Sequence, residues 1–302
     1  MPRPVVAACL ALPLLAVPAV AASWTLGHHG TGVGFGNSPE FTGIRLNLVD
    51  EDVRSVDGLN LTLWTPGENR RAVHRGVSLG LVAPSARDFH GVTAGLLGAE
   101  AEDDLRGLTV TGLGVGAGGD VIGIQLAGLG MGAGGDVRGI TFAGLGLGVA
   151  GSLEGAQVAL LGFGVEEDLR GLSFAGLGGG VDGSVIGITA SGLGLGVGGR
   201  ATGIQVAGLG IGAEELRGLT VAGLGLGASD ARGLQVAMGM VGADDLGGLT
   251  AAGYVRSERC TGVSIALFNR TEELRGVQLG LLNHAGNNPP LLRWLPLLNA
   301  HP

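Results

Sequence analysis

The sequence predicts an all-β protein, a narrow β-solenoid of about sixteen coils with a cap at each end. Three observations lead to this prediction. Glycine, with 63 of the 302 residues, recurs at a nearly fixed interval. Apolar and polar residues alternate strictly after each recurring glycine, as in a strand with one buried face. The glycine-rich segments show neither the triplet of collagen nor the proline and serine bias of a flexible linker.

Residues 1–22 have the pattern of a secretory signal peptide. Arg3 precedes an apolar stretch over Val5–Val20, and small residues follow, so we expect cleavage near Ala21 or Ala22. Pro4, Pro13 and Pro18 lie in or beside the apolar core of the leader, and this core is shorter than the roughly 20 residues that span a bilayer. A lipoprotein signal is the alternative, because the segment that ends at Cys9 resembles a lipoprotein processing box.

Composition limits the possible partners and cross-links. Without the leader the chain would retain one cysteine, Cys260, so no intramolecular disulfide is expected. The formal net charge of -8 argues against a nucleic-acid partner, because phosphate binding relies on a basic surface. The mean hydropathy of +0.43 is high. Charged residues nevertheless interrupt the chain after the leader so often that no apolar run of about 18 residues remains.

Repeat units are defined by what we call the anchor glycine, which opens each apolar, polar, apolar triplet. Successive anchor glycines are 16 residues apart from Gly107 to Gly203, 15 apart to Gly248 and 14 apart to Gly276. This self-similarity predicts stacked units of 14–18 residues. The anchor glycines are Gly43, Gly58, Gly76, Gly91, Gly107, Gly123, Gly139, Gly155, Gly171, Gly187, Gly203, Gly218, Gly233, Gly248, Gly262 and Gly276.

The triplet after each anchor glycine predicts a short strand. Its first and third residues are apolar in every unit, and its second residue is polar in every unit. We therefore expect the first and third residues to face the interior. The second residues would form a solvated outer ladder that hydrogen-bonds between coils. These second-position residues are Arg45, Asn60, Ser78, Thr93, Thr109, Gln125, Thr141, Gln157, Ser173, Thr189, Gln205, Thr220, Gln235, Thr250, Ser264 and Gln278.

A corner and a second short strand are expected after each triplet. In the segment Thr111–Gly116, a corner near Gly112 would reset the phase so that Leu113 and Val115 also face inward. Many units then end in a charged turn such as Asp103–Arg106, where the changes in repeat length are expected to fall. Two strands and two turns make one coil, and coils would stack about 4.8 Å apart.

An antiparallel β-meander or barrel is the alternative architecture, with one strand of about ten residues in each repeat. An outer-membrane barrel is expected to carry girdles of tryptophan and tyrosine. The units from Gly107 to Gly248 contain neither residue type. The sequence therefore favours the solenoid.

Caps are expected beyond both ends of the repeats, because terminal coils expose apolar core and unpaired strand edges. Residues 23–42 are the expected N-terminal cap, residues 43–283 the glycine-rich β repeat domain and residues 284–302 the C-terminal cap. Prolines near the C-terminus, at Pro289 and Pro290, would stop further strand addition.

The last two units, Gly262–Asn269 and Gly276–Asn283, resemble a bacterial surface-repeat family whose unit reads approximately Gly-Leu-Gln-Ile-Gly-Leu-Ile-Asn. The stretch Asn287–Asn299 is similar to the C-terminus of that family. The resemblance is close over Thr261–Asn299 and loose elsewhere, since central units replace the Leu-Asn end with Leu-Gly-x-Gly. It implies export and a cell-envelope location, and it brings no catalytic residue with it.

Two motifs of enzymes occur in the repeats, and we assign both to the repeat itself. Gly114–Gly119 matches the dinucleotide fingerprint, but similar strings recur in other units and no helical pattern follows them. Ser78 lies in a nucleophile-elbow string, but it occupies the polar second position that Thr or Gln fills elsewhere. No catalytic or cofactor-binding residue is predicted.

Metal binding was weighed at two places. His28 and His29 are adjacent but have no further histidine or cysteine at a spacing that suits zinc. Asp104, Asp120 and Asp136 would lie along one edge of the stack, where their oxygens could bind Ca²⁺. Nearby arginines offset these acids instead, so no metal ligand is predicted.

These observations together predict a non-catalytic, exported protein of the cell envelope, cell surface or extracellular space, with a structural or interaction role. The alternatives are an outer-membrane-inserted β-barrel protein and an enzyme of polysaccharide chemistry, for which the repeats offer few aromatic residues. The expected partner is an unidentified surface or envelope component, with membrane association as a further alternative. No cofactor, nucleic acid or small-molecule substrate is expected.

Overall fold

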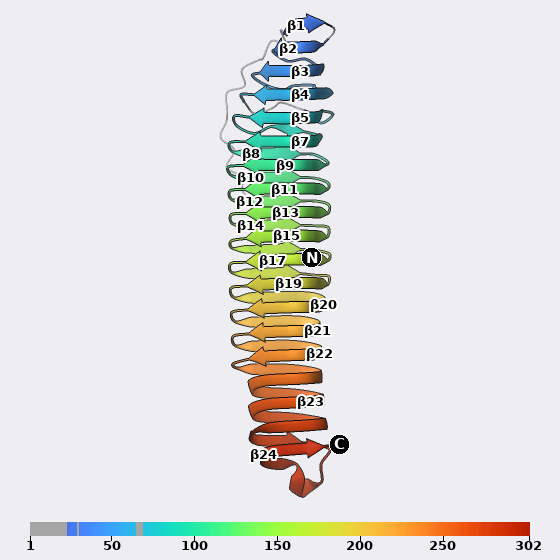
Figure 1. Cartoon of the computed structure of the whole chain (residues 1–302), viewed down its shortest axis with the longest axis vertical. Coiled ribbons are helices and arrows are strands. Elements are labelled where there is room, and N and C mark those ends of the chain that lie inside the picture. Colours follow the sequence, from blue (N-terminus) through green and yellow to red (C-terminus); the bar gives the residue numbers. More distant parts are fainter. Residues whose placement is uncertain (1–22, 29, 65–68) are drawn as a thin grey trace, which may run out of the picture.

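The computed structural model describes residues 23–28, 30–64 and 69–302, which form an elongated rod of stacked β coils (Figure 1). Successive coils pair in parallel along the rod, as β11 does with β13. The narrow β-solenoid is therefore confirmed, and the antiparallel alternative is excluded. No helix in the described ranges is long and apolar enough to cross a membrane. The expected signal peptide, residues 1–22, lies outside the described residues.

One sheet of the solenoid, which we call the long-strand sheet, contains the anchor glycines. Its register pairs each anchor glycine with the next, for example Gly123 with Gly139. Its separate strands are β3 (Glu40–Asn47), β4 (Ser55–Thr62), β5 (Val73–Gly80), β7 (Asp88–Gly95), β9 (Leu105–Thr111), β11 (Val121–Ala127), β13 (Val137–Ala143), β15 (Leu153–Ala159), β17 (Leu169–Ala175) and β19 (Val185–Ser191).

The second sheet, which we call the short-strand sheet, lies after the corner of each coil. Gly112 and Leu113 separate β9 from the following short strand, so the predicted corner near Gly112 is confirmed. The short strands are β6 (Ser85–Ala86), β8 (Gly98–Ala101), β10 (Gly114–Ala117), β12 (Gly130–Ala133), β14 (Gly146–Val149), β16 (Gly162–Val165) and β18 (Gly178–Val181).

In the later coils the chain stays extended through the charged turns. The pairing of adjacent coils jumps there from Val197 with Ala213 to Arg200 with Glu215, so one coil has a residue fewer in this turn. The prediction that the repeat shortens from 16 to 15 residues within the charged turn is thus confirmed. These coils belong to β20 (Gly194–Ala207), β21 (Gly210–Ala222), β22 (Gly225–Ala237) and β23 (Met240–Ala285).

The anchor position requires glycine for two reasons, which Gly171 illustrates. Its φ is +124°, a conformation that residues with a side chain rarely adopt. A Cβ atom added there would lie 2.0 Å from the carbonyl oxygen of Gly155 in the preceding coil. All sixteen anchor glycines have positive φ, so the same close approach of neighbouring coils runs along the whole column.

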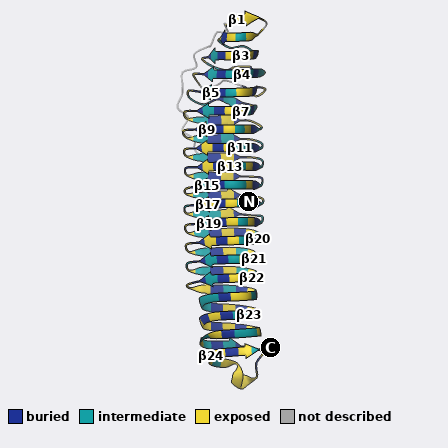
Figure 2. Ribbon diagram, viewed as in Figure 1, coloured by how far each residue is buried: buried dark blue, intermediate teal, exposed yellow. Residues whose placement is uncertain are grey.

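The long-strand sheet buries the opposite side of each strand from the one that we predicted. All sixteen second-position polar residues are buried, including Gln125 and Gln205, which are 0% exposed. The first and third residues of the triplet face solvent instead, as Ile140 does with 52% of its surface exposed. Figure 2 shows this alternation as bands of buried and exposed residues along the rod. The expected outer ladder of Thr, Gln and Ser is therefore an interior ladder.

This phase is set by residues on either side of the triplet. Leu105, two positions before the anchor glycine, and Thr111, four positions after it, share a strand side with the polar residue Thr109. All three are buried. Every residue two positions before an anchor glycine is likewise buried, and all but one of them are apolar. The polar residue is therefore held inside by the buried residues on the same side of its strand.

Two pairs in this interior ladder form the expected hydrogen bonds between coils, whereas the side-chain amides of Gln125 and Gln205 have no hydrogen-bond partner within the described residues. Ser173 Oγ donates to Gln157 Oε1 over 2.9 Å, and Thr250 Oγ1 donates to Gln235 Oε1 over 3.4 Å. The prediction of hydrogen bonds between coils is therefore confirmed for these two pairs. They lie in the interior, however, and not on the outer face where we expected them. A hydrogen bond offsets part of the cost of burying a polar group.

The short strands supply an apolar half of the core. Val115 and Ala117 of β10 are buried, whereas Gly114 and Gly116 lie on the outer side. Leu113, at the corner, is 44% exposed, so its predicted inward orientation is wrong and that of Val115 is right. The interior thus has a partly polar wall and an apolar wall.

Antiparallel strands occupy both ends of the described stack. At the N-terminal end, β1 (Trp24–His28) pairs antiparallel with β2 (Thr31–Phe35), and β2 pairs in parallel with β3. At the C-terminal end, the 3-10 helix η1 (Pro290–Leu292) leads into β24 (Trp294–His301), which pairs antiparallel with the end of β23. Each of these strands pairs with the last parallel strand at its end of the stack.

Candidate functional site

The most distinctive surface is the outer side of the long-strand sheet, which we call the apolar face. It consists of the residues one and three positions after the anchor glycines, and it follows the sheet from coil to coil. The exposed large apolar side chains on it are Ile44, Val92, Leu108, Val110, Ile124, Leu126, Ile140, Phe142, Leu172, Phe174, Ile188, Ile204, Val206, Leu234, Leu249, Ile265 and Leu279.

Exposed leucines at the corners widen the apolar face along one side. Leu63, Leu81 and Leu96 at the corners line a common depression of about 680 Å³ with Leu79 and Val110 of the face. The face and the corners are therefore one continuous apolar surface in this region. Further exposed leucines stand at successive corners, namely Leu113, Leu129, Leu145, Leu161, Leu177, Leu193, Leu209 and Leu224.

A charged edge borders the apolar face on the side away from the corners. Arg138 Nη2 donates to Asp136 Oδ2 over 2.8 Å, and the backbone N–H of Ser152 in the next coil donates to Asp136 Oδ1 over 2.9 Å. The same arrangement recurs at Asp104 and Asp168. Each of these three aspartates therefore joins two coils and pairs with an arginine of its own coil.

This geometry bears on the calcium site weighed from the sequence. Asp104 and Asp136 use one carboxylate oxygen for a backbone N–H group and the other for an arginine, so both oxygens are engaged. Asp120 accepts the backbone N–H of Asp136 in the same way. In the part of the chain that the structure describes, no group of three or more His, Cys, Asp or Glu side chains could hold a metal ion.

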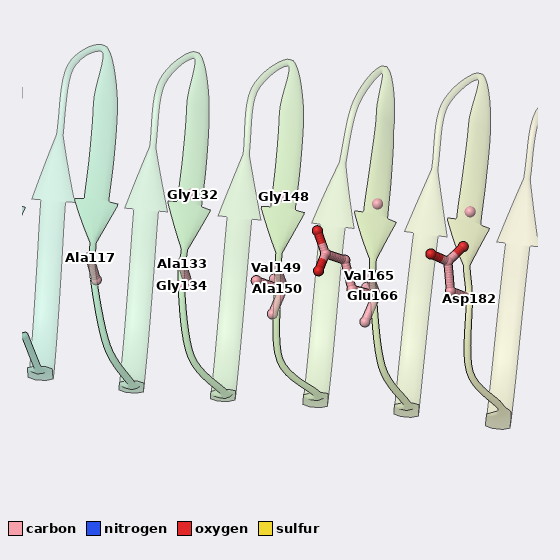
Figure 3. Close-up of a pocket in the computed structure, with 12 residues that line it drawn as sticks. Ala117, Gly132, Ala133, Gly134, Gly148, Val149, Ala150, Val165, Glu166 and Asp182 are labelled. Carbon is pink, nitrogen blue, oxygen red and sulfur yellow. The ribbon is translucent and has the colours of Figure 1, made fainter. Parts of the chain in front are cut away.

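The outer side of the short-strand sheet differs sharply from the apolar face. A Cβ atom added at Gly132, Gly148 or Gly164 would have no neighbour within 4 Å, so bare backbone forms this surface. These glycines line an open depression of about 650 Å³, whose charged residues are Glu166 and Asp182. Figure 3 shows both carboxylates and the small residues beside them on neighbouring coils. A row of glycines offers neither side chains nor hydrogen-bonding groups beyond the backbone, and we assign it no ligand.

The N-terminal coils contain a buried ion pair in the place of the neutral ladder. The guanidinium of Arg45 contacts the carboxylate of Asp50, and both side chains are almost completely buried. Asp50 also accepts hydrogen bonds from Asn47, Asn60 and Thr62. Burial alone would raise the pKa of Asp50, but the charge of Arg45 and these hydrogen bonds together lower it. The cluster is a satisfied interior network.

Ser78, which the sequence places in a nucleophile-elbow string, lies beside this network. Its Oγ is 3.1 Å from His74 Nδ1, and both residues are buried. The His74 ring packs edge-on against Phe89, with 5.3 Å between ring centroids. Burial is the main cause that lowers the pKa of His74 to about 4. A serine and histidine pair exists, but a substrate could reach it only if the coil opened.

The remaining candidate residues are not brought together into a site. Gly114–Gly119 forms β10 and the turn after it, and no helix follows. His28 ends β1, and His29 lies outside the described residues. Cys260 is buried, and burial raises the pKa of its thiol to about 11. A thiol of this kind is a poor nucleophile at neutral pH.

The apolar face was not predicted from the sequence, because its residues were assigned to the core. The signal that could have revealed it is the apolar residue two positions before each anchor glycine, such as Leu105, Val121 and Val137. That column fixes which side of the strand is buried, and it leaves the first and third triplet positions on the outside.

The chain matches no protein-family model, no curated protein and no solved structure. Functional inference therefore rests on the sequence and the geometry of the chain itself.

Proposed function

We propose that this chain is a non-catalytic, exported protein of the bacterial cell envelope or surface, which acts as a rigid scaffold by binding through its apolar face. The observation that carries this proposal is the run of exposed Leu, Ile, Val and Phe side chains along the long-strand sheet. The largest apolar patch on a typical soluble monomer covers about 300–600 Å². A face that extends over most of the rod exceeds this size, and large exposed apolar patches usually mark interaction surfaces.

Rigidity supports the scaffold role. Each coil is joined to the next by parallel strand pairing in both sheets, as at Gly123 with Gly139 and Gly130 with Gly146. The aspartate bonds of the charged edge add a further link between coils. A surface on such a scaffold keeps its shape, so binding through it orders few side chains beyond those already held.

Support for export and for the cell-envelope location comes from the sequence. The leader at residues 1–22 and the resemblance of Thr261–Asn299 to surface repeats both favour this compartment. The absence of a predicted disulfide is compatible with it, because the stack depends on strand pairing instead of cross-links.

Cell fractionation of the full chain with a C-terminal epitope tag tests this proposal. We expect a processed form that begins near Ala22 or Ser23 and is retained in the envelope fraction after a high-salt wash. The double variant Ile140→Arg, Leu172→Arg places two charges on the apolar face and should be released into the soluble fraction. A matched variant, Ala150→Arg, Ser229→Arg, adds the same charge at exposed positions outside the face and should stay in the envelope.

Retention of the face variant together with the wild type would contradict the binding role of the apolar face. An unprocessed chain that stays in the cytoplasm would contradict export. Circular dichroism of each variant, compared with the wild type, checks that the solenoid remains folded.

A further inference from the structure

We infer that the occupant of the apolar face is a second copy of this chain, so that two solenoids pack face to face as a dimer. This inference rests on the proposed function in one respect, namely that the apolar face is a binding surface. It adds the identity of the partner. Retention in the envelope is then a property of the dimer, whose two copies present every other surface twice, and the face variant is released because it cannot form that dimer.

The area of the face is sufficient for a stable dimer. The sixteen anchor glycines span fifteen coil steps of about 4.8 Å, and the outward triplet with its glycine is about 13 Å wide, so the face covers roughly 900 Å². Two copies would bury about 1,800 Å² in total, within the range of specific and stable interfaces. The corner leucines would add to this area.

The spacing of side chains on the face also favours a second copy. Side chains in each column recur at the coil spacing, because equivalent positions are paired in register, as Ile124 is with Ile140. A second solenoid presents the same spacing, so the ridges formed by one copy can fit between those of the other at every coil. Sheets that pack face to face interdigitate in this way. A lipid surface or an unrelated globular protein has no matching period.

Charge and composition argue against lipid as the occupant. Proteins that lie on membranes usually combine tryptophan or tyrosine with an excess of Lys and Arg. The chain has no lysine and a net charge of -8, and the face between Gly107 and Gly248 has neither tryptophan nor tyrosine. Arginines at the charged edge, such as Arg138 and Arg170, are already paired with aspartates.

A closed dimer would cover the face on both copies at once. In a dimer with two-fold symmetry the same surface of each subunit forms the contact, so no apolar face remains for further growth.

Sedimentation equilibrium and light scattering of the detergent-free protein, over nanomolar to micromolar concentrations, test this inference. We expect a dimer for the wild type that persists at high salt, because an apolar contact is not screened. Ile140→Arg, Leu172→Arg should raise the dissociation constant by about a hundredfold or more, since each dimer then carries four buried arginines without partners. Ala150→Arg, Ser229→Arg should leave it within about threefold of the wild type.

The outcomes separate this inference from the proposed function. A wild-type monomer at micromolar concentration that floats with phosphatidylcholine and phosphatidylglycerol vesicles would overturn the dimer but keep the binding role of the face. A dimer that Ile140→Arg, Leu172→Arg leaves intact would also overturn the inference, because the interface would lie elsewhere. If the wild type is monomeric and the same variant is retained in the envelope, both proposals fail.

Discussion

The long-strand sheet and the short-strand sheet are wound from the same chain, yet they place opposite chemistry inside and outside. The long-strand sheet buries polar residues such as Gln205 and exposes aliphatic ones such as Ile204. The short-strand sheet buries Leu195 and Val197 and exposes the glycine Gly196. An apolar residue in this protein therefore belongs to the core in one sheet and to the surface in the other.

The difference shows that burial in a solenoid is decided by the whole coil. The interior between the sheets already contains apolar side chains from the short strands and the residues two positions before the anchor glycines. Side-chain volume alone does not select polar residues on the long strands, because Gln125 and Gln205 are among the largest fully buried side chains. The long strands contribute polar side chains from Ser to Gln, and two pairs of them hydrogen-bond between coils, as Ser173 and Gln157 do.

The largest expected effect on stability is the loss of an anchor glycine in the long-strand sheet, and a glycine of the short-strand sheet provides the comparison. Gly171→Ala in the long-strand sheet should destabilise the protein by about 4 kcal/mol, because the φ of +124° and the approach to Gly155 O each cost about 2 kcal/mol. Gly164→Ala in the short-strand sheet places a methyl group in open space and should change stability by less than about 1 kcal/mol.

Urea unfolding followed by circular dichroism measures both effects. Equal midpoints for the two variants would contradict the close approach of coils at the anchor column. Because long stacked proteins can unfold in parts, the midpoint of the first transition is the quantity to compare.

A second effect concerns pH and the polar wall of the long-strand sheet. The pKa of His74 lies at about 4 in the folded chain and near 6.5 when unfolded, so the unfolded state binds more protons between these values. The contribution of neutral, buried His74 to the free energy of unfolding is therefore fully present above about pH 6.5 and falls as pH decreases toward 4. At pH 4 the protein has lost about 3 kcal/mol of stability through this group. The His74→Phe variant should lack this part of the pH dependence, whatever its overall stability.

Subtraction of the variant's profile from that of the wild type removes the contribution of carboxylates, which titrate near the lower end of this range. Direct titration of His74 by nuclear magnetic resonance provides a second measurement. A midpoint close to 6.5 in the folded protein would contradict its burial.

The smallest effects test which side of the long strand is buried. Ser173→Ala removes the donor to buried Gln157 Oε1 and should cost about 1–2 kcal/mol. Leu172→Thr changes the neighbouring exposed residue and should alter stability by less than about 0.5 kcal/mol when the protein is dilute enough to be monomeric. Denaturant midpoints that show the opposite order would support the orientation we expected from the triplet.

Much of the fold could be predicted from the repeat. Regular spacing at Gly107, Gly123 and Gly139 indicated stacked units, and alternation around each glycine indicated strands. The corner near Gly112 and the shortened turn beside Arg200 were also located correctly. These features depend on neighbours along the chain, and a repeating sequence displays such neighbours many times.

The candidate site could not be predicted from the triplet alone. Alternation tells which residues share a side of a strand, but Leu108 and Val110 could lie on either side of the sheet with the same pattern. We chose the interior because apolar residues are usually buried. The structure places them outside, and this reversal creates the apolar face.

The period, the strands and the positions that must be glycine could all be predicted from the sequence, since they follow from backbone geometry within one unit and its copies. Which side of the long strand is buried depends instead on the fold of the whole coil, because a closed coil has one interior of limited width. The residues that fill it depend on what the opposite strand contributes, as Val115 and Ala117 do opposite Thr109.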